Sequence, residues 1–283
     1  MTDAVNLSPF ILKQCRHGPL LYLRGDQYIG RSLELYGEFS EMEADLFVQI
    51  IRRGDVVVEV GANIGAHTVH LAQLTGPQGL VHAFEPQRVI HQIMCANVSL
   101  NGLLHVHAHH AAVGSETGQL RLPQVNYDGV GNFGGLSLVP GASEAAAQNG
   151  DTVPLLRIDS LSLPALKLLK VDVEGMEQDV LRGARQTIAQ HRPFLYVEND
   201  REEKSAALIS LIDELGYHMY WHLPPLYNPA NAAANAENVF PGIVSVNLFC
   251  VPKESTLSIE AFRRVSGPDD WWQRPPATVA GGN

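Results

Sequence analysis

The chain has 283 residues, of which 45% are hydrophobic and 18% are charged. This length and composition allow one α/β domain with appendages, or two small domains, to bury a sizeable core. The formal net charge of -10 at pH 7 argues against phosphate backbones and anionic membranes as partners. We therefore expect no nucleic-acid partner and no membrane partner.

The three cysteines, Cys15, Cys95 and Cys250, lack CxxC spacing, which argues against a thiolate zinc site and a disulfide framework. The first residues include Asp3 and one short apolar run, Phe10–Leu12, so they do not resemble a signal peptide. No apolar run is long enough to cross a bilayer as a helix. These features predict a cytoplasmic location.

The N-terminal part of the chain is expected to form a small structure of its own ahead of the core. Leu20–Leu23 and Ser32–Tyr36 are predicted to pair as a hairpin, and a helix is predicted from Glu41 to Ile51. Residues 1–45 are therefore assigned to an N-terminal hairpin or cap extension.

Apolar runs rich in β-branched residues then alternate with stretches of helical periodicity. Strands are predicted at Val56–Val60, Leu80–Phe84, Val106–His109, Leu168–Val173, Phe194–Val197 and Val244–Val251. Helices are predicted at Ala66–Leu74, Pro86–Leu100, Met176–Gln190 and Ser205–Leu215. Strands that alternate with helices of this length form βαβ units in a parallel sheet. The predicted fold class is α/β with a doubly wound sheet.

A segment without helical periodicity interrupts this alternation. Residues 114–159 are rich in Gly, Pro and Asn, and strand-like pieces occur at Gln119–Leu122, Leu136–Val139 and Val153–Ile158. This pattern predicts a β-rich insertion between the third and fourth core strands.

The last strands depart from the alternation in a different way. Tyr217–His222 and Val244–Val251 have no helix between them, only a loop that includes Leu223–Asn238. Two strands joined in this way predict an antiparallel pair at one sheet edge. Residues 255–283 are assigned to a C-terminal tail.

The strongest motif is Asp55–His67, which reads DVVVEVGANIGAH. A buried strand runs into Gly61 and Gly65 and a helix follows, so the turn presents backbone N–H groups and a helix N-terminus to a ligand. Asn63 stands between the two glycines, and asparagine is the side chain that best tolerates a left-handed backbone. The motif therefore predicts a ligand-binding turn.

Two acids indicate which ligand the turn takes. Glu59 lies two residues before Gly61, where a dinucleotide-binding motif has an apolar residue, and a carboxylate there repels a pyrophosphate and attracts an ammonium. Glu85 ends the second strand, where its two oxygens can accept both hydroxyls of a ribose. An amino acid joined to a ribonucleoside satisfies both acids, and S-adenosylmethionine is such a ligand.

Three segments follow one another along the chain in the order VVVEVGANIGAHTVHLA, HAFEP and LLKVDVEGMEQDVLRGA. Together they resemble the FkbM-type family of S-adenosylmethionine-dependent methyltransferases over roughly Gly37 to Lys253. The resemblance implies the class I methyltransferase fold, a Rossmann-like and mostly parallel sheet with an antiparallel C-terminal strand. It implies methyl transfer to a hydroxyl of a saccharide or secondary-metabolite acceptor, and it assigns residues 46–254 to the methyltransferase domain.

The resemblance also assigns residues to the cofactor. Glu59, Gly61, Asn63 and Gly65 correspond to the cradle for the methionine end of S-adenosylmethionine, and Glu85 corresponds to the acid that holds the ribose. The expected partner is a small-molecule or glycan substrate, and a homo-oligomer stays open.

Methyl transfer from a sulfonium requires a protein to align the acceptor oxygen and to remove its proton. Acids are expected at the carboxyl ends of the fourth and fifth strands, where active groups of doubly wound sheets lie. Asp172 is the first candidate catalytic residue and Glu198 is the second. For Glu174, capping of the following helix is an equally weighted alternative.

Other interpretations of the same residues stay open. Asp172, Glu198 and Asn199 match the disposition by which catechol-type methyltransferases hold a divalent cation, so this set is the alternative to the predicted absence of a metal. Outside this class, a non-catalytic cofactor-binding scaffold and a nicotinamide dehydrogenase are the alternatives. Glu59 and the missing third glycine argue against the dehydrogenase.

Overall fold

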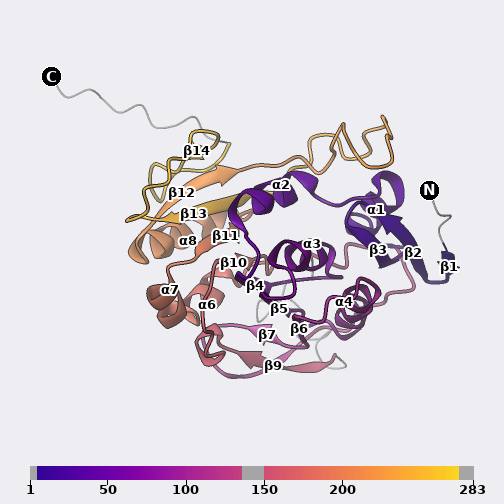
Figure 1. Cartoon of the computed structure of the whole chain (residues 1–283), viewed down its shortest axis with the longest axis horizontal. Helices are drawn as coiled ribbons and strands as arrows, with labels where there is room; N and C mark the ends of the chain where they lie inside the picture. The colour runs from indigo at the N-terminus through magenta and orange to yellow at the C-terminus, as the bar shows by residue number, and fades with distance from the viewer. Residues whose placement is uncertain (1–4, 136–149, 274–283) are drawn as a thin grey trace.

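The structure, a computed structural model, describes residues 5–135 and 150–273 (Figure 1). Its N-terminal part is a three-stranded antiparallel sheet followed by two helices. These elements are β1 (Val5–Leu7), β2 (Phe10–Cys15), β3 (Gly18–Leu23), α1 (Ile29–Tyr36) and α2 (Glu41–Ile50).

The predicted N-terminal hairpin was wrong in one of its strands. β3 contains Leu20–Leu23 as expected, but it pairs with β2, and Ser32–Tyr36 belongs to the helix α1. The buried side chains Leu33 and Tyr36 are three residues apart, which is a helical spacing that so short a segment does not distinguish from a strand. The carboxylate of Asp26 accepts hydrogen bonds from the backbone of the first helical turn, which supports the helix start.

The central sheet has eight strands in the order β14-β12-β13-β11-β10-β4-β5-β6. Its strands are β4 (Val56–Val60), β5 (Leu80–Phe84), β6 (Val106–His109), β10 (Leu168–Val171), β11 (Phe194–Glu198), β12 (Tyr217–His222), β13 (Asn247–Pro252) and β14 (Arg263–Arg264). β13 runs antiparallel to both β11 and β12, whereas β4, β5, β6, β10 and β11 are parallel. The predicted fold class, including the antiparallel C-terminal strand, is confirmed.

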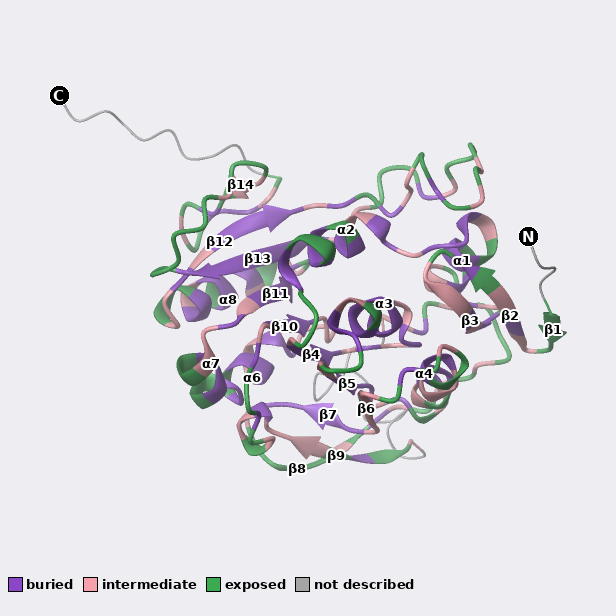
Figure 2. Ribbon diagram, in the orientation of Figure 1, coloured by how far each residue is buried: buried purple, intermediate pink, exposed green. Residues whose placement is uncertain are grey.

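Helices cover both faces of this sheet (Figure 1). They are α3 (Ala66–Thr75), α4 (Arg88–Leu100), α6 (Glu177–Arg182), α7 (Arg185–His191) and α8 (Glu202–Glu214). Along β4, Val57 packs with the cluster that includes α2, α3 and α4, and Val58 packs with the cluster that includes α6, α7 and α8. Because β4, β10 and β13 are buried on both faces, their sequences are almost continuously apolar (Figure 2).

The predicted continuous helix over Met176–Gln190 is divided into α6 and α7. The break lies at Gly183 and Ala184, where the chain passes close to the start of the insertion. A Cβ atom on Gly183 would overlap the carbonyl oxygen of Gly114. Close backbone packing therefore interrupts a helix that periodicity alone predicts as one element.

The insertion contributes two strands to a third sheet, which has the order β7-β9-β8. β7 (Ala112–Val113) lies just before the insertion, β8 (Gly118–Arg121) and β9 (Thr152–Leu156) lie within it, and the short helix η1 (Ile158–Ser160) follows. The predicted strand piece Leu136–Val139 lies outside the described residues. The domain boundaries after residues 45 and 254 remain predictions.

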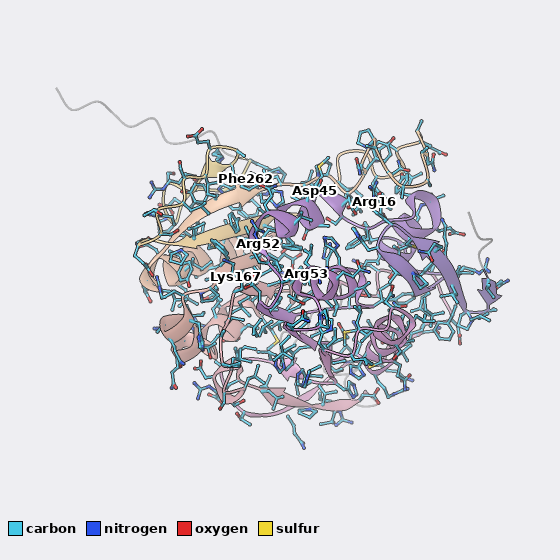
Figure 3. The ribbon with its side chains drawn as sticks, in the orientation of Figure 1. Arg16, Asp45, Arg52, Arg53, Lys167 and Phe262 are labelled. Atoms are coloured by element: carbon cyan, nitrogen blue, oxygen red, sulfur yellow. The ribbon has the colours of Figure 1, made fainter. Side chains whose placement is uncertain are left out.

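A buried carboxylate joins the N-terminal extension to the long loop that follows β12. Glu38 is 4% exposed and accepts hydrogen bonds from the side chain of Arg16 at 2.6 Å, from Asn228 Nδ2 at 2.8 Å and from the backbone N–H of Ala232 at 2.8 Å. Arg16, labelled near α1 in Figure 3, also donates to the carbonyl oxygen of Ala230. Glu38 thus links the N-terminal extension to the loop after β12, although the two segments are far apart in the sequence.

The sequence analysis predicts neither a disulfide framework nor a helix that crosses a bilayer. Cys15, Cys95 and Cys250 form no disulfide with one another. Within residues 5–135 and 150–273, every helix is too short or too polar to cross a bilayer.

We expect Glu38→Gln to destabilise the protein, because an amide cannot accept all three hydrogen bonds with the strength of a carboxylate. The free energy of unfolding in urea should fall by about 1–3 kcal/mol. Glu34→Gln, a substitution at an exposed position of the neighbouring helix α1, serves as the control and should change stability little. Equal stability of the two variants would contradict this role of Glu38.

Candidate functional site

A cavity of about 260 Å³ opens at the carboxyl ends of β4, β5, β10 and β11. The N-terminal extension, the insertion and the loop after β12 complete its walls. Six of the predicted site residues line it, and these are Glu59, Gly61, Asn63, Glu85, Asp172 and Glu198. Gly65 and Asn199 are not among the residues that line the cavity.

The turn after β4 has the backbone that its sequence predicts. Gly61, Asn63 and Gly65 have φ values of 83°, 50° and 81°, in the left-handed region that glycine and asparagine tolerate. A Cβ atom on Gly61 would overlap the carbonyl oxygen of Asp172, so glycine is required where β4 and β10 approach each other. The turn and Asp172 are therefore positioned by the same backbone contact.

Glu59 lies within β4 and is 1% exposed. Its Oε2 accepts a hydrogen bond of 2.6 Å from the hydroxyl of Thr68, and its Oε1 lies 3.8 Å from Lys170 Nζ. Burial raises the pKa of Glu59 to about 7, although Lys170 and the Thr68 hydroxyl act to lower it. A cationic ligand group would therefore find a carboxylate whose charge is incompletely compensated.

Glu85 lies at the tip of β5 and is 4% exposed. Its Oε2 accepts a hydrogen bond from the backbone N–H of Asn63 at 3.0 Å, and its Oε1 accepts one from the backbone N–H of Gln87 at 2.8 Å. A carboxylate offers about four acceptor positions, so each oxygen retains one for a ligand hydroxyl. Burial raises the pKa of Glu85 to about 7, against the lowering effect of the two N–H groups.

Gln87 was not predicted as a site residue, yet it connects the insertion to this corner of the cavity. Its Nε2 donates to the carbonyl oxygen of Phe133 at 2.8 Å, and its Oε1 accepts from the hydroxyl of Tyr127 at 3.0 Å. Gln87 lies just after the AFEP segment, but its contacts come from a distant loop, so no local sequence signal identifies its role.

Lys170 and Glu43 are the two charged residues that the sequence analysis missed. Both line the cavity, and they are 2% and 4% exposed. Lys170 leaves a signal in the sequence, because it is a lysine inside the buried strand Leu168–Val171. The sequence gives no such signal for Glu43, because an acid near the start of α2 is also favoured by the helix dipole.

Asp172 follows β10 and has a side chain that is 41% exposed. Its Oδ2 lies 3.1 Å from Lys170 Nζ, so it forms an ion pair with a buried ammonium while its other side faces the cavity. The role of Asp172 in aligning an acceptor remains a prediction.

Three further acids converge beside Asp172. Glu174, Glu198 and Asp200 each offer one oxygen, and these oxygens lie within 4.8 Å of one another. Burial and the charges of Asp172, Asp200 and Glu174 raise the pKa of Glu198 well above its usual range. Arg201 brings a positive charge to this group, since its Nη2 donates to Glu174 Oε2 at 2.6 Å.

The residues of the alternative metal-binding set, Asp172, Glu198 and Asn199, do not all converge on one point. Glu198 belongs to the converging group, but Asp172 pairs with Lys170 instead. Asn199 is 3% exposed, and its Nδ2 donates to Ser205 Oγ at 2.8 Å near the start of α8. The carboxylates that a cation would meet are therefore those of Glu174, Glu198 and Asp200.

The expected capping role of Glu174 was wrong. Glu174 has a left-handed backbone with φ of 55°, and α6 begins later, at Glu177. The carboxylate of Glu177 accepts a hydrogen bond of 2.7 Å from the backbone N–H of Gly175 near the start of α6. Glu174 instead pairs with Arg201, which places it in the acidic group.

Apolar and aromatic side chains also line the cavity. Tyr28 and Phe39 come from the N-terminal extension, and Leu226, Ile243 and Val244 come from the loop after β12. Tyr28, Phe39 and Leu226 belong to one apolar cluster. The strand ends thus supply most of the lining carboxylates, and the added segments supply an apolar wall.

The comparison with known families decides the class. The profile of the Methyltransferase FkbM domain matches residues 59–219, more than half of the chain. This chain belongs to the FkbM methyltransferase family. The predicted resemblance is confirmed.

A named relative matches only part of this chain. "Methyltransferase 1" of Beauveria bassiana (strain ARSEF 2860) is 31% identical over 157 residues, which cover 45% of this chain and 57% of that protein. The chain thus matches little more than half the length of that relative.

Solved structures of similar arrangement have low identity. The methyltransferase FkbM from Methylobacillus flagellatus KT has a TM-score of 0.43 and 18% identity, over 74% of this chain and 50% of that chain. An S-adenosylmethionine-dependent O-methyltransferase from Thermotoga maritima has a TM-score of 0.45 and 11% identity, over 88% of this chain and 85% of that chain.

The donor side of the cavity fits S-adenosylmethionine. Glu59 suits the ammonium of its methionine part, and the acceptor positions left on Glu85 suit the two ribose hydroxyls. A dinucleotide would instead bring a pyrophosphate toward the buried carboxylate of Glu59. The chemistry of these residues therefore favours the predicted methyl donor.

We expect the affinity for S-adenosylhomocysteine to fall as the pH is lowered through about 7. Glu59 and Glu85 have pKa values of about 7, so both are ionised above this pH and take up protons below it. Between pH 8 and pH 6, the dissociation constant should rise about ten- to a hundredfold. Titration calorimetry in two buffers should also record proton release on binding, and an affinity that is flat over this range would contradict the assignment.

Proposed function

We propose that this FkbM methyltransferase uses S-adenosylmethionine to methylate a hydroxyl group of a saccharide or secondary-metabolite acceptor. The observation that supports this most is the sharing of one cavity by the donor-side acids and the strand-end acids. Glu59 Oε1 and Asp172 Oδ2 both lie near Lys170 Nζ, at 3.8 Å and 3.1 Å. A donor at Glu59 and an acceptor at Asp172 would therefore be neighbours.

The acceptor side supports a polyhydroxylated molecule. Carboxylates are hydrogen-bond acceptors only, and several of them around one space suit a ligand that presents several hydroxyl donors. The wall that contains Tyr28, Phe39 and Leu226 suits the apolar face of a ring. A strongly anionic acceptor would be repelled by the carboxylate of Asp172.

Asp172 is the candidate that aligns the acceptor hydroxyl and takes its proton. S-adenosylmethionine, when bound, supplies a methyl group on a positively charged sulfur. An alcohol is a very weak acid, so its proton leaves late, and correct alignment contributes more than the basicity of the carboxylate. The ion pair with Lys170 suits this role because it fixes the orientation of Asp172.

Glu198 is the candidate for a different role at the same acceptor. Because its pKa lies well above the usual range, its carboxyl group retains a proton at higher pH than an exposed glutamate does. Its Oε2 is buried and has no hydrogen-bond partner within the described parts of the chain. A protonated carboxyl group can donate to a second acceptor oxygen, which would orient the ring while Asp172 takes the proton.

A substrate panel tests the proposed reaction. The full chain is incubated with S-adenosylmethionine and with neutral glycosides, polyphenols, amines and uronates, and the products are examined for the added mass of one methyl group. We expect methylation of a neutral hydroxyl compound. Binding of S-adenosylhomocysteine without turnover on any compound would favour the non-catalytic scaffold, and binding of NAD alone would favour the dehydrogenase.

On any acceptor that the panel identifies, Asp172→Asn should reduce kcat about 100-fold or more while the affinity for S-adenosylhomocysteine changes little. The amide keeps the shape of the carboxylate but cannot take the proton. Asp179→Asn is the matched control, since its side chain is 45% exposed on α6 and outside the cavity. Equal losses of turnover and of cofactor affinity would indicate that Asp172 has a structural role instead.

Chelation should leave turnover unchanged if the predicted metal-free reaction holds. Arg201 already places a positive charge beside the converging acids, which reduces their attraction for a cation. Activity is measured before and after dialysis against EDTA. Inhibition that added Mg²⁺ reverses would instead support a cation at Glu198, with Glu174 and Asp200 as its further ligands.

A further inference from the structure

Lys170 occupies a position where a lysine is rarely found. It lies in the middle of β10, directly opposite Glu59 of β4 and Tyr196 of β11, and it is 2% exposed. Its strand neighbours Leu169 and Val171 are fully buried. An ammonium in such a place is costly unless opposite charges compensate it.

Three carboxylates provide this compensation, and each comes from a different element. Lys170 Nζ lies 3.1 Å from Asp172 Oδ2 at the end of β10 and 3.8 Å from Glu59 Oε1 on β4. Glu43 on α2 is the third carboxylate that acts on Lys170. Burial alone would lower the pKa of Lys170, but Asp172, Glu59 and Glu43 together raise it above its usual range, so the group is an ammonium.

The remaining groups around Lys170 do not compete for this charge. His67 on α3 is buried and has a pKa well below its usual range, because of burial and then of the charge on Lys170, so it is neutral. Tyr196 on β11 has a pKa well above its usual range, so it is also neutral. The charge balance near the donor and acceptor sides therefore depends on one ammonium and three carboxylates.

We propose that Lys170 is a positioning residue that holds the carboxylates of Glu59 and Asp172 in alignment and favours the charged form of Glu59. This inference rests on the proposed function, because it assigns Glu59 to the cofactor ammonium and Asp172 to the acceptor hydroxyl. One ammonium thus connects the carboxylate that binds the donor with the carboxylate that serves the acceptor. The residue acts through these two acids and does not itself transfer a proton.

The position of Lys170 within the sheet supports this role more than a purely structural one. An apolar residue at this position of β10 would avoid the cost of burying an ammonium. The lysine instead lies where the backbone contact of Gly61 with Asp172 brings the donor turn against the acceptor strand. It is therefore placed to hold both acids at the point where their two ligands would meet.

The test measures binding of S-adenosylhomocysteine between pH 6 and pH 9 in the full chain and in variants. Lys170→Met should move the lower pH limit of binding upward by about one unit or more, because Glu59 loses its nearest cation. Lys170→Arg, which keeps the charge, should restore the wild-type profile. Lys167→Met is the control: Lys167 precedes β10, packs over the ring of Phe194 and lies outside the cavity (Figure 3).

A second variant separates positioning from simple charge balance and guards against loss of folding. In the wild type, with all three acids in their charged form, three carboxylates and one ammonium leave two negative charges. The double substitution of Lys170→Met with Glu43→Gln leaves the same two charges, on Glu59 and Asp172, without a buried cation. Circular dichroism and thermal unfolding establish that each variant is folded.

We expect the double variant to keep an upward shift that is smaller than that of Lys170→Met, because the charge of Glu43 also raises the pKa of Glu59. On any identified acceptor, it should lose more in kcat than in KM for the acceptor. A wild-type pH profile in Lys170→Met or in the double variant would overturn the inference. An upward-shifted profile in Lys170→Arg would also overturn it. If the wild type itself does not bind S-adenosylhomocysteine, the proposed function fails instead. The two failures are therefore distinguishable.

Discussion

The arrangement of this site depends on the burial of like charges at one end of a parallel sheet. Glu43, Glu59 and Asp172 surround a single ammonium, that of Lys170, and the first two carboxylates are almost inaccessible to water. Such a group is stable only when its geometry is accurate, since each uncompensated charge in a poorly solvated place costs several kcal/mol. The surrounding elements are arranged so that this geometry is held from several directions.

The carboxyl edge of the sheet provides the rigid part of this arrangement, and added segments provide the rest. The donor turn and the strand-end acids lie on β4, β5, β10 and β11, whose neighbours fix their register. The apolar wall comes from the N-terminal extension and the loop after β12. In the proposed function, the cofactor would therefore lie against the strand ends, and the acceptor would contact segments that lie outside the core of the fold.

The sequence analysis succeeded where a local pattern determines the structure. Val56–Val60 and Leu80–Phe84 have the predicted bounds, and the glycine turn has the left-handed backbone that its residue types require. It failed where tertiary contacts decide, as in the helix α1 and in the division of the helix after β10 at Gly183. Lys170 and Glu43 belong to the second kind, because a charged residue becomes part of a site only when distant elements bury it with its partners.

The carboxylate of Glu38 has a consequence for how this protein can acquire new specificity. It accepts hydrogen bonds from the N-terminal extension and from the loop after β12 at the same time. An exchange of only one of these segments with that of a relative would leave a buried charge without its donors. The two segments therefore depend on each other structurally. A chimaera designed for a different acceptor would need to replace both of them together and keep the sheet and its donor turn unchanged.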